Sequence, residues 1–288
     1  MRPERGRANN SDMKQEAKKV TVFVGSAHKA GATYRAACQF REELESYGNL
    51  HCEIVVLSDY NLGVCRGCKI CFERGEERCP LKDDRDALIE KMTASDGVVF
   101  ASPNYSFQVS AIMKIFLDRL GFVFHRPRFH GKTYTGIVVQ GIYGGGKIAK
   151  YLDFVGFGLG FNVVNGSCIK TLEPMDDRAL DKMQGTLAGQ ARRFHARLSR
   201  PAHPAPSLFG LMAFRMGRTS IKLALGADKR DHVYYREQGW FESDYFYPTR
   251  LGPLKKAVGA VFDWVAARVY RQPEGNRPAV IELSGGKS

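Results

Sequence analysis

The sequence contains no apolar run long enough to span a membrane, and its N-terminal stretch, MRPERGRANNSDMKQEAKK, lacks the apolar segment that a secretory signal requires. Internal repeats and low-complexity tracts are absent as well. We therefore expect residues 1–18 to form a disordered tail, and we expect the protein to be cytoplasmic.

Neither of the two best-known phosphate-binding loops is present. The P-loop of nucleotide triphosphatases needs Lys followed by Ser or Thr after its second glycine, and the dinucleotide fingerprint needs the pattern GxGxxG. The nearest stretch has Gly25 and Gly31 and neither of these features. Both standard nucleotide motifs are therefore excluded, which leaves a less specific anion site open.

The chain has seven cysteines, and four of them lie between Cys65 and Cys79. In a chain of 288 residues without a secretory signal, such a cluster favours a reducing compartment and a metal or redox role over disulfide bonds.

Strand-like and helical segments alternate along residues 19–199. We expect strands at residues 20–24, 51–57, 97–101, 133–140 and 162–169. We expect helices at residues 84–92, 110–120, 147–158 and 176–198. This alternation predicts βαβ units and an α/β fold with a doubly wound, flavodoxin-like sheet of five parallel strands.

Residues 200–288 differ in composition from the rest of the chain. Residues 190–288 contain 17 Lys and Arg against 8 Asp and Glu, so they carry +9 of the net charge of +13. Aromatic residues gather at 232–247, and 254–269 has the pattern of an amphipathic helix. We expect a mainly helical extension that packs across a partner subunit or shields a ligand. Contact with an anionic membrane surface is an alternative, whereas no regular basic and aromatic stripe indicates nucleic acid.

The loop after the first expected strand is a candidate anion site. Small or polar residues follow residues 20–24, and apolar residues with helical spacing begin at Ala37. A helix N-terminus offers unpaired N–H groups and a partial positive charge to an anion. The candidate binding residues are Ser26, His28, Gly31, Ala32 and Thr33.

Two further loops are expected at the same edge of the sheet. The loop at residues 102–107 offers flat and hydrogen-bonding side chains, and the loop after residue 140 is rich in glycine, so its backbone can approach a ligand closely. The candidates here are Pro103, Asn104, Tyr105, Ser106, Phe107, Gly141, Gly144 and Gly145. Together the three loops suit a phosphorylated, planar ligand with a polar edge.

These loops resemble those of the NAD(P)H-dependent FMN reductase family. GSAHKAGAT at residues 25–33 stands where the family commonly has GSPRxxGNT. SPNY at residues 102–105 and KIFLDR at 114–119 match its SPxY and KxFLDR patterns, and the resemblance covers roughly residues 20–198. The first loop departs at Ala27, His28 and Ala32, which removes an Arg and an Asn that can donate to phosphate.

The resemblance implies that FMN is the cofactor and that NADH or NADPH is the electron donor. Electrons would pass to a quinone, a flavin or another acceptor, and we assign no side chain as a catalytic acid or base. We interpret Lys114, Asp118 and Arg119 as a charged helix face or a subunit contact.

The cysteine cluster is the most distinctive chemical signal. Cys65, Cys68 and Cys71 follow a CxxCxxC spacing, and Cys79 is followed by proline, which is similar to ferredoxin-type cluster motifs with a longer last spacer. The arrangement resembles the iron–sulfur flavoproteins, which carry a [4Fe–4S] cluster beside FMN. Free or redox-active thiols and structural zinc remain alternatives. We expect a homo-oligomer, because a neighbouring subunit could complete the contact between cluster and flavin.

Two other functions stay open. The protein could act as an iron–sulfur electron carrier for a protein partner, which the cysteines favour. It could also be a non-catalytic flavodoxin-like binding module, which the departures in the first loop favour.

Overall fold

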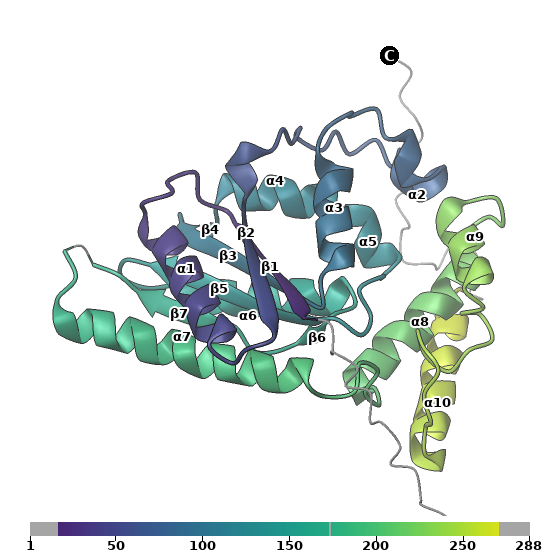
Figure 1. The fold of residues 1–288 in the computed structure, drawn as a ribbon. Helices are drawn as coiled ribbons and strands as arrows, with labels where there is room; N and C mark the ends of the chain where they lie inside the picture. Colours follow the sequence, from purple (N-terminus) through teal and green to yellow (C-terminus); the bar gives the residue numbers. More distant parts are fainter. Residues whose placement is uncertain (1–16, 173, 271–288) are drawn as a thin grey trace, which may run out of the picture.

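The computed structural model describes residues 17–172 and 174–270, and a parallel sheet forms the centre of the described structure (Figure 1). The strand order is β2-β1-β3-β5-β6, with β4 paired to β3 and β7 paired to β5. The strands are β1 (Lys18–Val24), β2 (Leu50–Val56), β3 (Gly97–Tyr105), β4 (Gln108–Val109), β5 (Thr133–Gln140), β6 (Asn162–Val163) and β7 (Ser167–Lys170). This is the expected flavodoxin-like order, in which ligands bind at the carboxyl ends of the strands.

Helices cover both faces of the sheet, so the central strands are buried on both sides. Every residue of β5 is buried, as its run of β-branched side chains predicts. One face packs against α1 (Ala32–Glu45) and α7 (Asp177–Leu198). The other face packs against α3 (Arg85–Ala94), α4 (Ala111–Arg119), α5 (Gly121–His125) and α6 (Gly145–Gly158).

The fifth strand position differs in detail from the expectation. Residues 162–169 do not form one strand, because β6 and β7 pair separately with β5. Between them, the Gly166 N–H donates to the Asp153 carboxylate at 2.9 Å, and a Cβ at Gly166 would lie 2.6 Å from the Gly136 carbonyl. Because Val163 pairs with Tyr134 and Ser167 with Ile137, three residues, 164–166, lie opposite only two residues of β5, and this interrupts the ladder.

The second loop also begins later than expected. Ser102–Tyr105 continues β3, which then turns at Ser106 and Phe107 into the two-residue strand β4. Both turn residues have left-handed backbones, with φ of 49° and 62°. The aromatic ring of Phe107 is therefore presented at the tip of a tight hairpin.

The C-terminal segment is helical, with α8 (Leu208–Ala224), α9 (Arg230–Glu237) and α10 (Pro253–Tyr270). These helices lie beside the end of the sheet where β6 is found (Figure 1). Aromatic side chains form their core, which contains Phe214, Tyr235, Trp240 and Tyr245. Among the described residues, no helix is both long and apolar enough to cross a membrane.

Parts of the expected N-terminal tail and of the C-terminal extension are not among the residues that the structure describes. Residues 1–16 of the expected tail and residues 271–288 of the extension are not among the described residues, and Lys18 already belongs to β1.

Candidate flavin and cysteine sites

A cavity of about 380 Å³ lies at the carboxyl edge of the sheet. All three expected loops contribute to its lining. The expected residues that it brings together are Ser26, His28, Gly31, Ala32, Thr33, Pro103, Asn104, Tyr105 and Gly141. Four expected residues do not line it: Ser106, Phe107, Gly144 and Gly145.

The first loop presents hydrogen-bond donors to this cavity. Gly31 is the N-cap of α1, and the first turn of the helix carries no acidic side chain. A hydrogen bond from the Gly31 N–H to the His28 carbonyl, at 3.0 Å, closes the turn before the helix. Ser26 and Thr33 also line the cavity, and both are buried. The arrangement can hold a dianionic phosphate.

Sequence reasoning missed Arg35 as a residue of this cavity. Arg35 lines the cavity, and its Nη1 donates a hydrogen bond to the Ala30 carbonyl at 2.6 Å. Its position one turn into α1, on the same face as the loop, was the available signal. Lys29, by contrast, is paired with Asp59 at 2.8 Å. Arg35 therefore supplies positive charge where the family's loop arginine is absent.

The second loop supplies an acceptor without a partner. The Asn104 Nδ2 donates to the Tyr143 carbonyl at 3.0 Å, which fixes the amide. The Asn104 Oδ1 is buried and has no hydrogen-bond partner among the described residues. A buried carbonyl oxygen is costly to leave unpaired, so the cavity suits a ligand with an N–H group at its edge. FMN fits this cavity on both counts, because it has a phosphate and a ring edge with an N–H group.

The glycine-rich loop supports the second loop rather than lining the cavity along its length. Gly144 has φ of 95°, and a Cβ there would lie 3.0 Å from the Phe107 ring. The Gly145 N–H donates to the Gln140 side chain at 2.6 Å. The first contact requires glycine, because a side chain at Gly144 would be strained and crowded against Phe107. The second brings the backbone of Gly145 close to the Gln140 side chain.

The four clustered cysteines line a separate cavity of about 310 Å³. Cys65 and Cys68 are exposed, whereas Cys71 and Cys79 are partly buried. Within residues 17–172 and 174–270, no three His, Cys, Asp or Glu side chains are grouped so that they could hold a metal ion. The loop thus brings the sulfurs to one cavity without closing them around a common point.

Arg119 lies in this cavity, although we expected it on a charged helix face or at a subunit contact. Its side chain is buried, and it binds Asp83 at 2.9 Å and the Cys79 Sγ at 3.3 Å. The available signal was its spacing from Phe116, which places both on the buried face of α4. Lys114 and Asp118 do form an exposed ion pair.

The two partly buried thiols differ in pKa. Burial raises the pKa of Cys71 above its ordinary value. Burial acts in the same direction on Cys79, but the hydrogen bond from Arg119 and its positive charge outweigh it, so the pKa of Cys79 lies below its ordinary value. Arg119 therefore favours a thiolate at Cys79.

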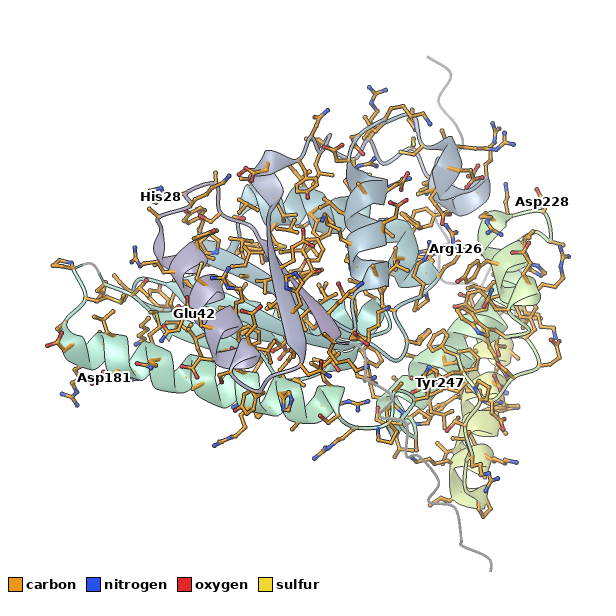
Figure 2. The ribbon with its side chains drawn as sticks, viewed as in Figure 1. His28, Glu42, Arg126, Asp181, Asp228 and Tyr247 are labelled. Atoms are coloured by element: carbon orange, nitrogen blue, oxygen red, sulfur yellow. The ribbon has the colours of Figure 1, made fainter. Side chains whose placement is uncertain are left out.

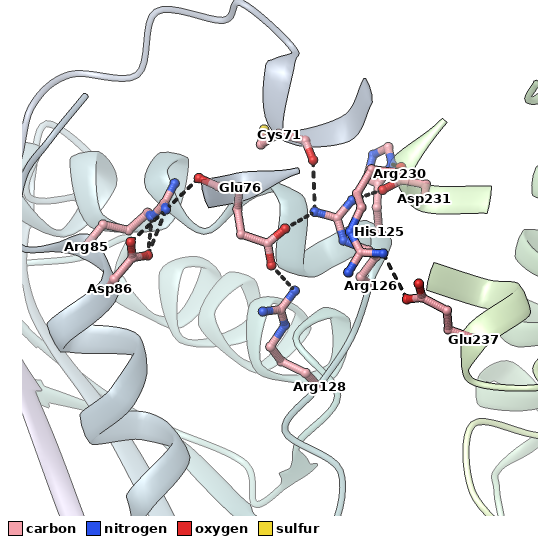
Figure 3. Close-up of polar contacts among 10 residues, drawn as sticks. All are labelled: Cys71, Glu76, Arg85, Asp86, His125, Arg126, Arg128, Arg230, Asp231 and Glu237. Atoms are coloured by element: carbon pink, nitrogen blue, oxygen red, sulfur yellow. Dashed lines mark hydrogen bonds and ion pairs between the residues drawn. The ribbon is translucent and has the colours of Figure 1, made fainter. Parts of the chain in front are cut away.

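A second arginine, Arg126, ties the cysteine loop to the C-terminal helices (Figure 3). Its Nη2 donates to the Cys71 carbonyl at 2.9 Å and to Glu76 at 2.8 Å, and its Nη1 is paired with Asp231 of α9. Arg128 binds the other oxygen of Glu76 at 2.9 Å. The cysteine loop and the extension thus share one buried guanidinium.

Comparison with known proteins places the chain in a family. The model of the family described as NADPH-dependent FMN reductase matches residues 18–170. An iron–sulfur flavoprotein of Archaeoglobus fulgidus is 34% identical over 158 residues, which cover 51% of this chain and 70% of that protein. An iron–sulfur flavoprotein of Methanocaldococcus jannaschii is 35% identical over 101 residues, which cover 35% of this chain and 51% of that protein.

One solved structure is similar over nearly the whole chain. RosB with bound 8-demethyl-8-formylriboflavin-5′-phosphate has a TM-score of 0.51 and 12% identity, over 94% of this chain and 99% of its own. At that identity the similarity concerns the fold alone. The family match, in contrast, spans more than half of the sequence and its range includes all three candidate loops. This protein therefore belongs to the NADPH-dependent FMN reductase family and is a flavin-dependent oxidoreductase similar to the iron–sulfur flavoproteins.

Proposed function

We propose that the protein passes electrons from NADH or NADPH, through FMN bound at the carboxyl edge of the sheet, to a quinone, a second flavin or another small acceptor. The observation that supports this most directly is one cavity that combines the N-terminus of α1 with the unpartnered Asn104 Oδ1. When bound, FMN supplies hydride uptake and electron transfer, and the protein supplies binding and orientation.

The chain's own residues have distinct tasks in this proposal. Ser26, Thr33 and the first-turn N–H groups of α1 hold the phosphate, and Arg35 adds positive charge. Asn104 orients the ring by accepting a hydrogen bond from its edge. Tyr105 lines the cavity with an exposed side chain, so it can cover one face of the ring and limit access of water.

Steady-state turnover tests this function. The flavin-loaded protein is mixed with NADH or NADPH and with menadione as acceptor, and oxidation of the nicotinamide is followed by its absorbance. Sustained turnover supports a reductase of small acceptors. Reduction of the bound flavin without turnover supports the electron-carrier alternative, and a protein that retains no flavin supports the non-catalytic module.

We also propose that Cys65, Cys68, Cys71 and Cys79 hold a [4Fe–4S] cluster. The lining of one cavity by all four sulfurs and the similarity to iron–sulfur flavoproteins support this. Ligation would require the loop to draw the two exposed thiols inward. Anaerobic iron and sulfide analysis decides among the candidates: about four irons per chain support the cluster, one zinc supports a structural site, and no metal supports free thiols.

We also propose that the protein forms a homo-oligomer and that it is located in the cytoplasm. Exposed apolar side chains surround the flavin cavity, and they are Tyr105, Phe107, Ile142 and Tyr143. Patches of this kind mark protein contact surfaces. Light scattering after gel filtration measures the mass directly, and a monomer at micromolar concentration would contradict the oligomer.

Contact of the extension with anionic lipid is a second candidate role for residues 200–288. On α10, Leu254 is 77% exposed and Trp264 is 61% exposed, and the same helix carries Lys255 and Lys256. Sedimentation with vesicles that contain phosphatidylserine tests this role. A Leu254→Glu, Trp264→Glu double variant should lose binding, whereas Leu180→Glu on α7 should keep it. Absence of binding by the unaltered protein would rule the role out.

A further inference from the structure

A third cavity, of about 560 Å³, lies where the C-terminal helices meet the flavodoxin-like domain. Its aromatic walls come from both parts of the chain and include Phe124, Phe157, Phe161, Tyr235, Tyr245 and Phe246. A volume of this size suits a small organic ligand. The cavity is remote from the flavin loops, because Tyr247, which also lines it, lies at the opposite end of the molecule from His28 (Figure 2).

The helix α8 leaves room in this cavity. Ala213, Gly217 and Ser220 line it at helical spacing, so three small side chains face the aromatic walls. A Cβ built at Gly217 would meet no atom of the described part of the chain within 4 Å. The space between the aromatic walls and α8 is therefore open rather than filled by side chains.

The lining is almost free of charge. Although the chain carries a net charge of +13, no Asp, Glu, Lys or Arg among residues 17–172 and 174–270 lines the cavity. His125 does line it, and its Nδ1 is engaged with Asp231 at 2.8 Å. An ionic ligand would lose its hydration without a compensating partner here, so an uncharged ligand is favoured.

One polar group in the lining has no partner. His130 stacks on Phe246 with 4.8 Å between ring centres. Its Nε2 is buried and makes no hydrogen bond with any described residue. Burial also lowers the pKa of His130 to about 4, so the imidazole is neutral at physiological pH. A neutral ring nitrogen can exchange one hydrogen bond with a ligand, which would recover the cost of leaving it unpaired.

We propose that this cavity binds an uncharged, flat aromatic ring that bears one hydrogen-bonding group, with the ring between the aromatic walls and α8 and the polar group at His130. Aromatic walls favour stacked or edge-to-face contacts with such a ring. The inference goes beyond the proposed function and does not depend on it, because none of the residues involved belongs to the flavin cavity.

The lining of the aromatic cavity contacts the lining of the cysteine cavity. His125, in its lining, contacts Phe72 with 4.3 Å between ring centres, and Phe72 lines the cysteine cavity. This pair of rings connects the linings of the two cavities. A ligand in the aromatic cavity would therefore lie next to the wall of the cysteine site.

Calorimetric titration of the full-length, flavin-loaded protein with 2-naphthol tests the proposal. The charged analogue 2-naphthalenesulfonate has the same ring system and should bind at least tenfold more weakly. His130→Phe should weaken 2-naphthol binding by about 2- to 10-fold, which corresponds to one neutral hydrogen bond.

A variant in which a larger side chain fills the cavity gives an independent test. Gly217→Leu should reduce 2-naphthol affinity more than tenfold, because the new side chain occupies the open space. The matched control is Gly185→Leu on α7, where a Cβ also meets nothing within 4 Å and no residue of the cavity is near in sequence. It should bind 2-naphthol as the unaltered protein does.

Three results would overturn the proposal. They are no measurable binding of 2-naphthol by the unaltered protein at millimolar concentration, equal binding by Gly217→Leu, and equal binding of the sulfonate. If Gly217→Leu does not fold, the comparison of the unaltered protein with His130→Phe decides, and equal affinities for 2-naphthol count against the site.

Discussion

Arg126 and Asp231 form an ion pair in which the side chains are 0% and 2% exposed, although 105 residues separate them in the sequence. The same guanidinium binds the Cys71 carbonyl and Glu76, so one side chain joins α9 to the cysteine loop (Figure 3). A buried charge is stable only while its partners remain, so this pair holds α9 against the cysteine loop.

Replacement of Asp231 by Ala should lower the free energy of unfolding by about 3–5 kcal/mol, because it leaves Arg126 buried without its main counter-charge. Urea denaturation measures the change. Glu237→Ala provides the control on the same helix, since Glu237 pairs with Arg230 and is 52% exposed. That variant should lose at most about 1 kcal/mol. Equal effects of the two variants would show that the Arg126 pair does not hold the extension in place.

Removal of the two side-chain hydroxyls that we propose to bind the FMN phosphate should weaken FMN binding. In a Ser26→Ala, Thr33→Ala double variant we expect a loss of about 3–4 kcal/mol, taking roughly 1.5–2 kcal/mol for each hydrogen bond to a charged group. Flavin fluorescence on titration with FMN measures the affinity. Ser46→Ala, Thr93→Ala is the matched control, because these hydroxyls donate to helix carbonyls on the surface. Unchanged FMN affinity in the first variant would refute the phosphate assignment.

Loss of one cysteine should separate the two proposed cofactors. Cys68→Ser should lose iron and sulfide while it keeps most of its flavin, because no residue that the structure describes lines both the cysteine cavity and the flavin cavity. Iron, sulfide and flavin are measured on anaerobically purified protein. Cys38→Ser, on α1, should retain all three. Equal metal content in the two variants would remove Cys68 from the ligand set.

The buried His130 should make stability depend on pH. Its pKa is about 4 in the folded protein and near the ordinary 6.5 when unfolded, so the unfolded chain binds the proton first as pH falls. Above about pH 6.5, His130 is neutral in both states and does not change the free energy of unfolding with pH. Between pH 6.5 and pH 4, protonation of the unfolded chain lowers that free energy by roughly 3 kcal/mol in total.

His130→Phe should remove this part of the pH dependence. Unfolding free energies of the variant and the unaltered protein, measured in urea at pH 7 and pH 5, give the difference. His51→Phe, at an exposed position, should keep the pH dependence of the unaltered protein. A His130→Phe variant with the original dependence would show that His130 takes up its proton in the folded state as easily as in the unfolded state.

Local patterns in the sequence were sufficient for the framework of the domain. The buried run at 133–140 is β5 at the same bounds, and the alternation of strands and helices predicted the parallel, flavodoxin-like sheet that the structure has. The turn before α1 was also evident, because small residues between a strand and an amphipathic helix are a local signal. The three candidate binding loops could be located for the same reason, and all three contribute to the lining of one cavity.

Only the tertiary structure decided which distant residues meet. Arg119 is a cavity residue because α4 turns it toward Cys79, and Asp231 is buried because Arg126 lies opposite it. The expected strand at 162–169 is divided because residues 164–166 lie opposite only two residues of β5. The aromatic cavity exists because α8 presents Gly217 to rings from two parts of the chain. Each of these depends on contacts between residues far apart in sequence, whereas periodicity reports only on neighbours along one element.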